Sequence, residues 1–212
     1  MKQLVIVGSG GFAREVLWLL EEINKEAPTG QAPYDLLGFI TNTDETHLQG
    51  LPVLGDDQWA FDNLAKSVWF VLAIGNSELR AKLALDYLQS GLRPARLVHP
   101  SVHMSDEVQL GGGVVICAGA VLTTNIVIGE FALININATI GHDAVLGDFT
   151  TVHPGANING HVEIGDMSEI GSGAVILPQT KIGDSVIVGA GAVVTKPLPE
   201  SGTYIGVPAN RV

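Results

Sequence analysis

The sequence predicts two folds in series: an α/β domain with a small parallel sheet, followed by a parallel β-helix of hexapeptide repeats. Over residues 1–97, apolar strand-like runs alternate with helical patterns, as they do in parallel α/β proteins. From Val98 to Val194 every sixth residue is apolar, at 17 positions without a slip in phase. Because 46% of the chain is hydrophobic, chance would produce this series on the order of once in 10⁵–10⁶. The second domain is therefore placed at 98–212.

The first domain is predicted from its apolar runs and turn residues. The run Lys2–Val7 indicates a buried strand, and the glycine-rich stretch from Gly8 to Gly11 indicates a turn before a helix. Asn76 is placed to cap the last helix of the domain. The expected elements are strands at 2–7, 34–40 and 68–74, helices at 12–24 and 77–91, and a long polar loop at 41–57.

The six-residue period identifies the second domain, because neither a helix, with period 3.6, nor a strand, with period 2, produces it alone. In a parallel β-helix each hexad supplies one short strand and one corner, and three hexads close a triangular coil of 18 residues. Successive coils pair about 4.8 Å apart, so residues 18 positions apart lie one above the other. The 17 hexads make between five and six coils.

The 18-residue spacing makes His142 and Asp143 the strongest candidates for catalysis. They occupy a corner of their hexad, where side chains point away from the aliphatic core. Asp143 stacks on Asn125 and His161, which can both hydrogen-bond to it, whereas His142 stacks on small residues, Gly160 among them. An outward imidazole beside a carboxylate suits general base catalysis, because imidazole titrates near neutral pH. A solvated surface pair is the alternative interpretation.

Other histidines and the single cysteine are weaker candidates. His161 is a rival base, since it stacks on Asp143. Another column with a spacing of 18 contains His99, Cys117, Asn135 and His153. Cys117 and His153 would lie about 9–10 Å apart across two coils, whereas zinc lies about 2.0–2.3 Å from its ligands. We therefore expect a polar ladder and no metal site, and nothing is placed to activate Cys117 as a nucleophile.

The charge balance excludes some partners. The chain carries 22 Asp and Glu against 11 Lys and Arg, a net charge of −11, which argues against nucleic acid and anionic membranes. No apolar stretch approaches the ~20 residues of a membrane span, and no signal peptide is recognised, so a cytoplasmic protein is expected. Lys196 and Arg211 lie near the C-terminus, where a phosphate-bearing ligand would find cations. A solvated tail is the alternative.

The glycine-rich turn suggests a phosphate site. Gly8, Gly10 and Ala13 follow the spacing of a dinucleotide fingerprint, and the start of the following helix favours anions. The acidic residue that would bind a nicotinamide ribose about 20 positions further on is missing, and about 95 residues is short for a full dinucleotide fold. A small Rossmann-like sheet that holds a phosphate group, without an NAD site, is therefore expected.

Several motifs together resemble the hexapeptide-repeat acyltransferases. They are the unbroken hexads with IGHD at 140–143, the ending YIGVPANR at 204–211, VIVGSGG at 5–11 and AIGN at 73–76. Over essentially the whole chain, the two-domain order is similar to bacterial sugar acetyltransferases related to sialic acid O-acetyltransferases and to N-acetyltransferases of UDP-linked 4-amino sugars. The resemblance implies a left-handed β-helix and a homotrimer. It also implies acetyl-CoA in the groove between adjacent β-helices, with the sugar held by the N-terminal domain.

The resemblance also implies roles for individual residues, with His142 as the catalytic base and Asp143 as its acidic partner. The implied substrate contacts are Gly10, Gly11, Phe12, Thr41, Asn42 and Gly75. The implied acetyl-CoA contacts are Thr151, Ser172 and Ala190, to which we add Lys196 and Arg211 as phosphate-binding cations. The family pattern often has His in place of Phe12, acidic residues in place of Thr41-Asn42, and a CoA-binding His in place of Thr151.

The expected function is N-acetylation of a nucleotide-linked 4-amino sugar by direct transfer from acetyl-CoA, within surface polysaccharide biosynthesis. Two alternatives stay open. One is O-acetylation of sialic acid or another glycan hydroxyl, because a histidine base serves an alcohol as well as an amine. The other is a non-catalytic assembly protein that binds a nucleotide sugar.

Overall fold

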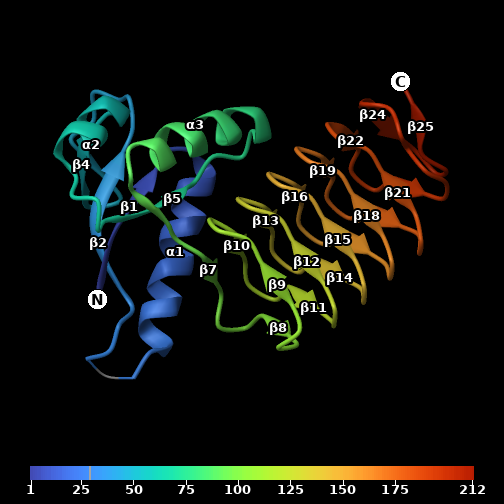
Figure 1. The fold of residues 1–212 in the computed structure, drawn as a ribbon, viewed down its shortest axis with the longest axis horizontal. Helices are drawn as coiled ribbons and strands as arrows, with labels where there is room; N and C mark the ends of the chain where they lie inside the picture. Colours follow the sequence, from blue (N-terminus) through green and yellow to red (C-terminus); the bar gives the residue numbers. More distant parts are fainter. Residues whose placement is uncertain (29) are drawn as a thin grey trace. The chain divides into compact units, whose positions relative to one another are not determined.

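A computed structural model describes residues 1–28 and 30–212 and divides the chain into two compact units, Met1–Pro100 and Ser101–Val212 (Figure 1). The division falls three residues beyond the boundary expected at residue 97. Within the described residues, no helix has the length and apolar character needed to cross a membrane.

The first unit is built around a mainly parallel sheet with the strand order β3-β4-β2-β1-β5-β6. Its central strand, β1 (Lys2–Val7), pairs in parallel with β2 (Tyr34–Ile40) on one side and β5 (Trp69–Leu72) on the other. Leu4 to Val7 of β1 are buried, as expected of a strand covered on both faces. The helices are α1 (Gly11–Glu26), α2 (Asp57–Asn63) and α3 (Ser77–Gln89).

The predicted strands at 2–7, 34–40 and 68–74 and both predicted helices are confirmed, but the polar loop predicted at 41–57 is wrong. That segment contains β3 (His47–Leu48) and β4 (Leu51–Gly55) and leads into α2. Pro52 and the bounding glycines hid β4, because proline removes a ladder donor. The structure tolerates Pro52 because β4 pairs with β2 only through Val53 and Gly55. The two-residue strand β6 (Arg93–Pro94) was also not predicted.

The second unit is a left-handed parallel β-helix whose short strands form the three faces of a prism. One face contains β10 (Val115–Ile116), β13 (Leu133–Ile134), β16 (Thr151–Val152), β19 (Glu169–Ile170) and β22 (Val186–Val188). The next contains β8 (His103–Met104), β11 (Val121–Leu122), β14 (Thr139–Ile140), β17 (Asn157–Ile158), β20 (Val175–Ile176) and β23 (Val193–Val194). The third contains β9 (Gln109–Leu110), β12 (Val127–Ile128), β15 (Val145–Leu146), β18 (Glu163–Ile164) and β21 (Lys181–Ile182).

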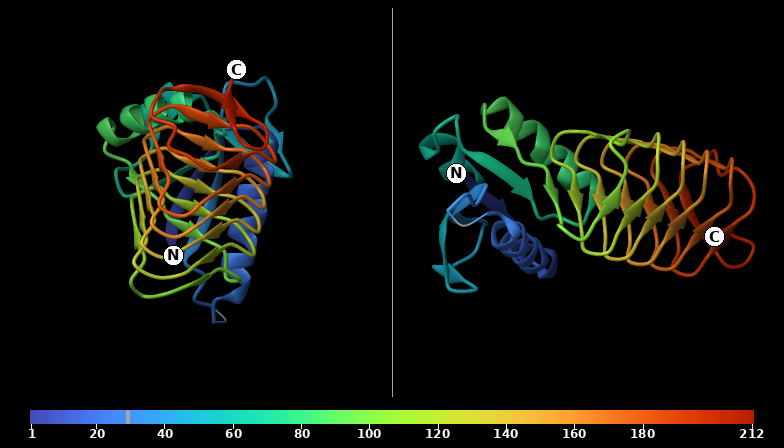
Figure 2. Two further views of the ribbon diagram at one scale, coloured as in Figure 1. Left: turned by 90° about the vertical axis from the view of Figure 1, so that its right-hand side faces the viewer. Right: turned by 90° about the horizontal axis from the view of Figure 1, so that it is seen from below.

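The predicted 18-residue register is confirmed along this prism. Ile140, for example, pairs with Leu122 on one side and Ile158 on the other, and all three side chains are buried. Figure 2 shows the coils stacked one behind the next along a single axis. The register ends at the last coil, where Ile182 bridges to Leu198, 16 residues away. There β24 (Gly202–Ile205) pairs in an antiparallel manner with β25 (Asn210–Arg211).

Candidate active site

The corner between β14 and β15 presents His142 and Asp143 to solvent, with 57% and 37% of their side chains exposed. Asp143 has a φ of 60°, in the left-handed region, and its N–H donates to the carbonyl of Thr124 on the coil before. Aspartate adopts this conformation more readily than most residues. The corner turn therefore directs the carboxylate away from the aliphatic core, toward the neighbouring imidazole.

The two side chains form a short hydrogen bond, with His142 Nδ1 at 2.7 Å from Asp143 Oδ2. When Nδ1–H donates to the carboxylate, Nε2 of His142 is left as the proton acceptor. Asn125 donates to Oδ1 of Asp143 at 3.3 Å, and His161 Nε2 lies 3.6 Å from Oδ2. The hydrogen bond from His142 holds the pKa of Asp143 below its usual value, and the Asn125 hydrogen bond and the two nearby imidazoles act in the same direction. The stacking predicted for Asn125 and His161 on Asp143 is thus confirmed.

Gly160 forms the support on which the imidazole of His142 rests. A Cβ atom added at Gly160 would lie 2.7 Å from both Cε1 and Nε2 of His142. The small residue predicted beside His142 therefore makes room for the ring itself. The next residue, His161, donates its backbone N–H to the carbonyl of His142 at 2.9 Å.

Three side chains at this corner are close enough to share a metal ion. His142, Asp143 and His161 each offer a ligand atom, and these atoms lie within 4.8 Å of one another. Hydrogen bonding and charge attraction to the shared carboxylate already account for their positions.

In the column of His99, Cys117, Asn135 and His153, two polar side chains make contacts outside the column. Asn135 donates to the carbonyl of Val152 at 3.0 Å. His153 Nε2 lies 3.6 Å from Glu169 Oε2, and Cys117 is buried. His99, in the first unit, stacks obliquely against Trp18.

In the first unit, the carboxyl ends of β2 and β4 line a polar pocket of about 430 Å3. Thr41 and Asn42, both predicted substrate contacts, lie in its wall, and Thr41 Oγ1 donates to Ser9 Oγ at 2.9 Å. This bond joins the end of β2 to the glycine-rich turn. The sequence did not single out the other residues that line the pocket, which are Thr43, Asp44, Val53, Gly55 and Asp56. They fall in the segment interpreted as a loop.

Two of the three glycines predicted to contact substrate face open space. Gly10 is the N-cap of α1, and a Cβ at Gly10 or Gly75 would meet nothing within 4 Å. Gly11 begins α1, and Phe12 beside it is half-buried. The backbone N–H groups at this helix start have the arrangement that favours a phosphate.

A buried arginine, which sequence reasoning missed, holds the loop that contains Gly75. Arg80 is completely buried, and its Nη1 donates to the carbonyls of Ile74 and Gly75, each at 2.9 Å. The same loop packs on the glycine-rich turn, because a Cβ at Gly8 would lie 2.9 Å from Ile74 Cδ1. Arg80 lies in a predicted helix whose apolar residues follow an amphipathic pattern. Its place in the sequence therefore gave no indication that the side chain is buried.

A single chain does not bring the predicted acetyl-CoA contacts to the His142 corner. Ser172 and Ala190 are exposed at the corner between the β16 and β17 faces, and Thr151 is buried within β16. Lys196 is exposed two residues after β23, at the end of the β-helix. Arg211 forms an ion pair with Glu200 and donates to the carbonyl of Ser201.

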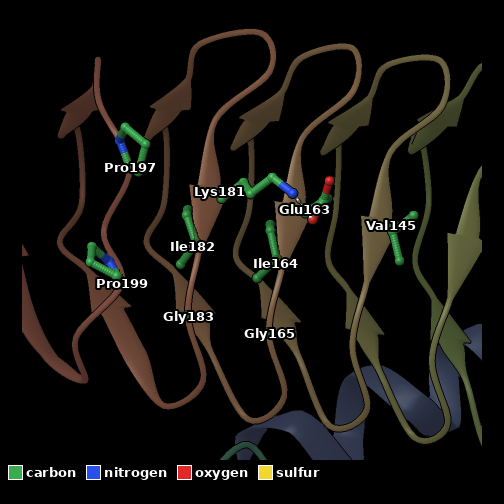
Figure 3. A pocket seen from close by; sticks show the side chains of 9 residues that line it. All are labelled: Val145, Glu163, Ile164, Gly165, Lys181, Ile182, Gly183, Pro197 and Pro199. Atoms are coloured by element: carbon green, nitrogen blue, oxygen red, sulfur yellow. Dashed lines mark hydrogen bonds and ion pairs between the residues drawn. The ribbon is translucent and has the colours of Figure 1, made fainter.

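The β-helix also carries a groove of about 650 Å3 on the face that follows the His142 corner (Figure 3). Val145 lies at one end, two residues after Asp143, and Pro197 and Pro199 lie at the other. Lys181 and Glu163 project from adjacent strands and pair at 2.8 Å. The remaining lining residues are Ile164, Gly165, Ile182 and Gly183.

Comparison with known families agrees with both halves of this architecture. Residues 3–86 match the PglD N-terminal domain, and residues 161–196 match the bacterial transferase hexapeptide repeat. The left-handed β-helix of hexapeptide repeats places the chain in the class of hexapeptide-repeat transferases.

Three relatives show which members of this class the chain resembles. The acetyltransferase domain of PglB from Neisseria gonorrhoeae is 29% identical, with a TM-score of 0.91 and full coverage of both chains. A perosamine N-acetyltransferase from Caulobacter crescentus, solved with CoA and GDP-perosamine as a histidine-to-asparagine variant, is 32% identical. Its TM-score is 0.88, over 99% of this chain and 96% of that chain. The GDP-perosamine N-acetyltransferase of Escherichia coli O157:H7 is 34% identical over 136 residues, which span 62% of this chain and 58% of that relative. The chain belongs to the hexapeptide-repeat sugar acetyltransferases with a PglD-type N-terminal domain.

Proposed function

We propose that this protein transfers the acetyl group of acetyl-CoA to the amino group of a nucleotide-linked amino sugar. The observation that carries the proposal is the exposed hydrogen-bonded pair of His142 and Asp143, with Nδ1 and Oδ2 2.7 Å apart. A scaffold protein has no need of an exposed imidazole oriented by a carboxylate. The relatives solved with CoA and GDP-perosamine support an amino sugar linked to a nucleoside diphosphate as the acceptor.

His142 and Asp143 divide the chemistry between them. Nε2 of His142 removes a proton from the acceptor nitrogen as it attacks the thioester carbonyl, a contribution worth about 10²–10⁴ in rate. Asp143 holds Nδ1–H, which fixes the tautomer and stabilises the imidazolium that forms. The acetyl group passes directly from sulfur to nitrogen, and the proton then goes to the departing thiolate.

The nucleotide portion of the acceptor binds the first unit. Its diphosphate is held at the start of α1, where Gly10, Gly11 and Phe12 begin the helix and no side chain caps it. The pocket that contains Thr41 and Asn42 receives the nucleoside, and the open backbone at Gly75 contacts the same ligand. These placements follow the rule that ligands of parallel sheets bind at the carboxyl ends of the strands.

Acetyl-CoA binds the second unit, and a homotrimer completes its site. Ser172 and Ala190 lie on a different corner of the prism from His142, so they can meet that imidazole only when they come from a second copy. The groove between Val145 and Pro197 receives the pantetheine arm, since it begins two residues from Asp143 and is lined mainly by apolar groups. Thr151, Lys196 and Arg211 are assigned to the same cofactor, the two cations to its phosphates. The proposed use of acetyl-CoA and a nucleotide sugar supports a cytoplasmic location and a role in the supply of sugars for surface polysaccharides.

Thiol release from acetyl-CoA tests the proposed function. UDP-, GDP- and dTDP-linked 4-amino sugars are compared with free sialic acid as acceptors, with the wild type and His142→Ala. Release that requires an amino sugar nucleotide and falls at least tenfold in His142→Ala supports the proposal. Release with sialic acid alone would indicate O-acetylation, and release with none of them would favour a binding protein.

A further inference from the structure

The corner that carries His142 presents three metal-ligating side chains from two adjacent coils of the β-helix. His142 and Asp143 come from one coil, and His161 stacks on Asp143 from the next. Each side chain offers one ligand atom, and these atoms lie within 4.8 Å of one another. Nδ1 of His142 lies 2.7 Å from Asp143 Oδ2, and Nε2 of His161 lies 3.6 Å from the same oxygen. Both imidazoles are more than half exposed, so an ion can reach these atoms from solvent.

These distances suit a tetrahedral transition-metal ion. Zinc lies about 2.0–2.1 Å from an imidazole nitrogen and about 2.0–2.2 Å from a carboxylate oxygen, so neighbouring ligand atoms in a tetrahedral site lie about 3.3 Å apart. The separations of 2.7 and 3.6 Å fall on either side of that value. Two imidazoles and one carboxylate favour zinc over magnesium and calcium, which prefer oxygen ligands. Three protein ligands leave the fourth position to water, as in open zinc sites.

The backbone holds these three ligands in place before an ion binds. Asp143 and His161 have left-handed φ values of 60° and 57°, so the same turn is repeated on successive coils. The N–H of His161 donates to the carbonyl of His142 at 2.9 Å, which ties the two coils together. Asn125 donates to Oδ1 of Asp143 at 3.3 Å, on the other oxygen from the one that faces the imidazoles. A hydrogen bond of this kind orients a ligating carboxylate and strengthens metal binding.

We propose that Nδ1 of His142, Oδ2 of Asp143 and Nε2 of His161 bind one zinc ion, and that the ion inhibits acetyl transfer. The inhibition rests on the proposed function, whereas the binding of the ion does not. A neutral imidazole carries a single proton, on one of its two nitrogens. When zinc takes the place of the proton on Nδ1 of His142, the proton is carried by Nε2 instead. Nε2 then has no lone pair with which to accept a proton from the acceptor.

Competition for zinc against a chromogenic chelator measures the site without acetyl transfer. The full-length wild type, His161→Asn and a matched control, His153→Asn, are compared. Asparagine suits the left-handed backbone at 161, and melting temperatures check that each variant is folded. His153 also lies 3.6 Å from a carboxylate, but among the described residues it belongs to no group of three ligands.

We expect one zinc ion per chain in the wild type and in His153→Asn, and no binding of magnesium by this site. Binding should be about tenfold weaker or more in His161→Asn, because one of the three ligands is lost. Equal zinc affinity in the wild type and His161→Asn would overturn the proposal, and so would equal competition by magnesium.

Inhibition is measured as amide formation, followed by chromatography at buffered concentrations of free zinc, because zinc also binds the thiol of released CoA. Each protein is compared with its own rate in the presence of EDTA. Halving the rate of His161→Asn should need about tenfold more zinc or more than halving that of the wild type, and His153→Asn should respond as the wild type does. Equal zinc sensitivity of the wild type and His161→Asn would overturn the proposal. A wild type that binds zinc through His161 but forms no amide in EDTA would support the metal site and refute the proposed function, and the inhibition with it.

Discussion

Replacing Gly160 with alanine tests whether the position of the His142 ring matters. The new Cβ would lie 2.7 Å from Cε1 and Nε2 of His142, whereas carbon atoms in contact prefer about 3.5 Å, so the ring must move by roughly 0.8 Å. The backbone at Gly160 is outside the left-handed region, so alanine adds no strain there. A misplacement of about 1 Å can cost roughly 10²-fold in rate. We therefore expect kcat/KM to fall about 10–10²-fold while the melting temperature changes little.

Gly155→Ala is the matched control for this experiment. Gly155 has a φ of 68° at another corner, and a Cβ there meets nothing within 4 Å. Alanine at Gly155 should therefore strain the backbone and lower the melting temperature without moving an imidazole. Steady-state rates and thermal unfolding of both variants separate the two effects. Wild-type kcat/KM in Gly160→Ala would refute the reasoning, and so would an equal loss of activity in Gly155→Ala.

Three further predictions follow from the two units. In Asp143→Asn, kcat/KM at neutral pH should fall by about 10²-fold or more, with the exposed Asp106→Asn as control. The hydrogen bond from His142 lowers the pKa of Asp143 and keeps the carboxylate charged at neutral pH, so the neutral amide removes the charge that faces Nδ1 of His142; a loss smaller than about tenfold in steady-state assays would contradict this role. In Arg80→Met, KM for the nucleotide sugar should rise about tenfold or more, since hydrogen bonds from a charged donor contribute about 1.5–3 kcal/mol. KM for acetyl-CoA should be unchanged, and equal effects on both substrates in initial-rate measurements would argue against a local role. Ile170→Ala, in the fully buried core of the β-helix, should lower the free energy of unfolding by about 2–5 kcal/mol, measured by urea denaturation, and a loss below 1 kcal/mol would contradict close packing there.

The β-helix could be predicted almost completely from the sequence, because every coil has the same packing requirement. Each coil needs an aliphatic residue at the same place, and Ile140 and Ile158 occupy equivalent places one coil apart. The fixed spacing of 18 also predicted which groups flank Asp143. Spacing alone could not show that the His142 ring rests on Gly160, because that contact depends on a side-chain rotamer.

The first unit was less predictable, because its features are not periodic. Strand β4 is short and contains Pro52, so neither alternation nor length marked it. Arg80 differs from a surface arginine only in its burial, which follows from tertiary packing. The acetyl-CoA contacts remain predictions, since Ser172 and Ala190 require a second copy to reach the catalytic corner.

A structure of the assembled protein with CoA and an amino sugar nucleotide would test the central claim most directly. We expect the acceptor nitrogen within hydrogen-bond reach of His142 Nε2, about 2.6–3.2 Å. We also expect the CoA sulfur beside the same imidazole, with Ser172 and Ala190 of a second copy against the cofactor. An acceptor nitrogen held away from His142, or CoA bound by one copy alone, would contradict it.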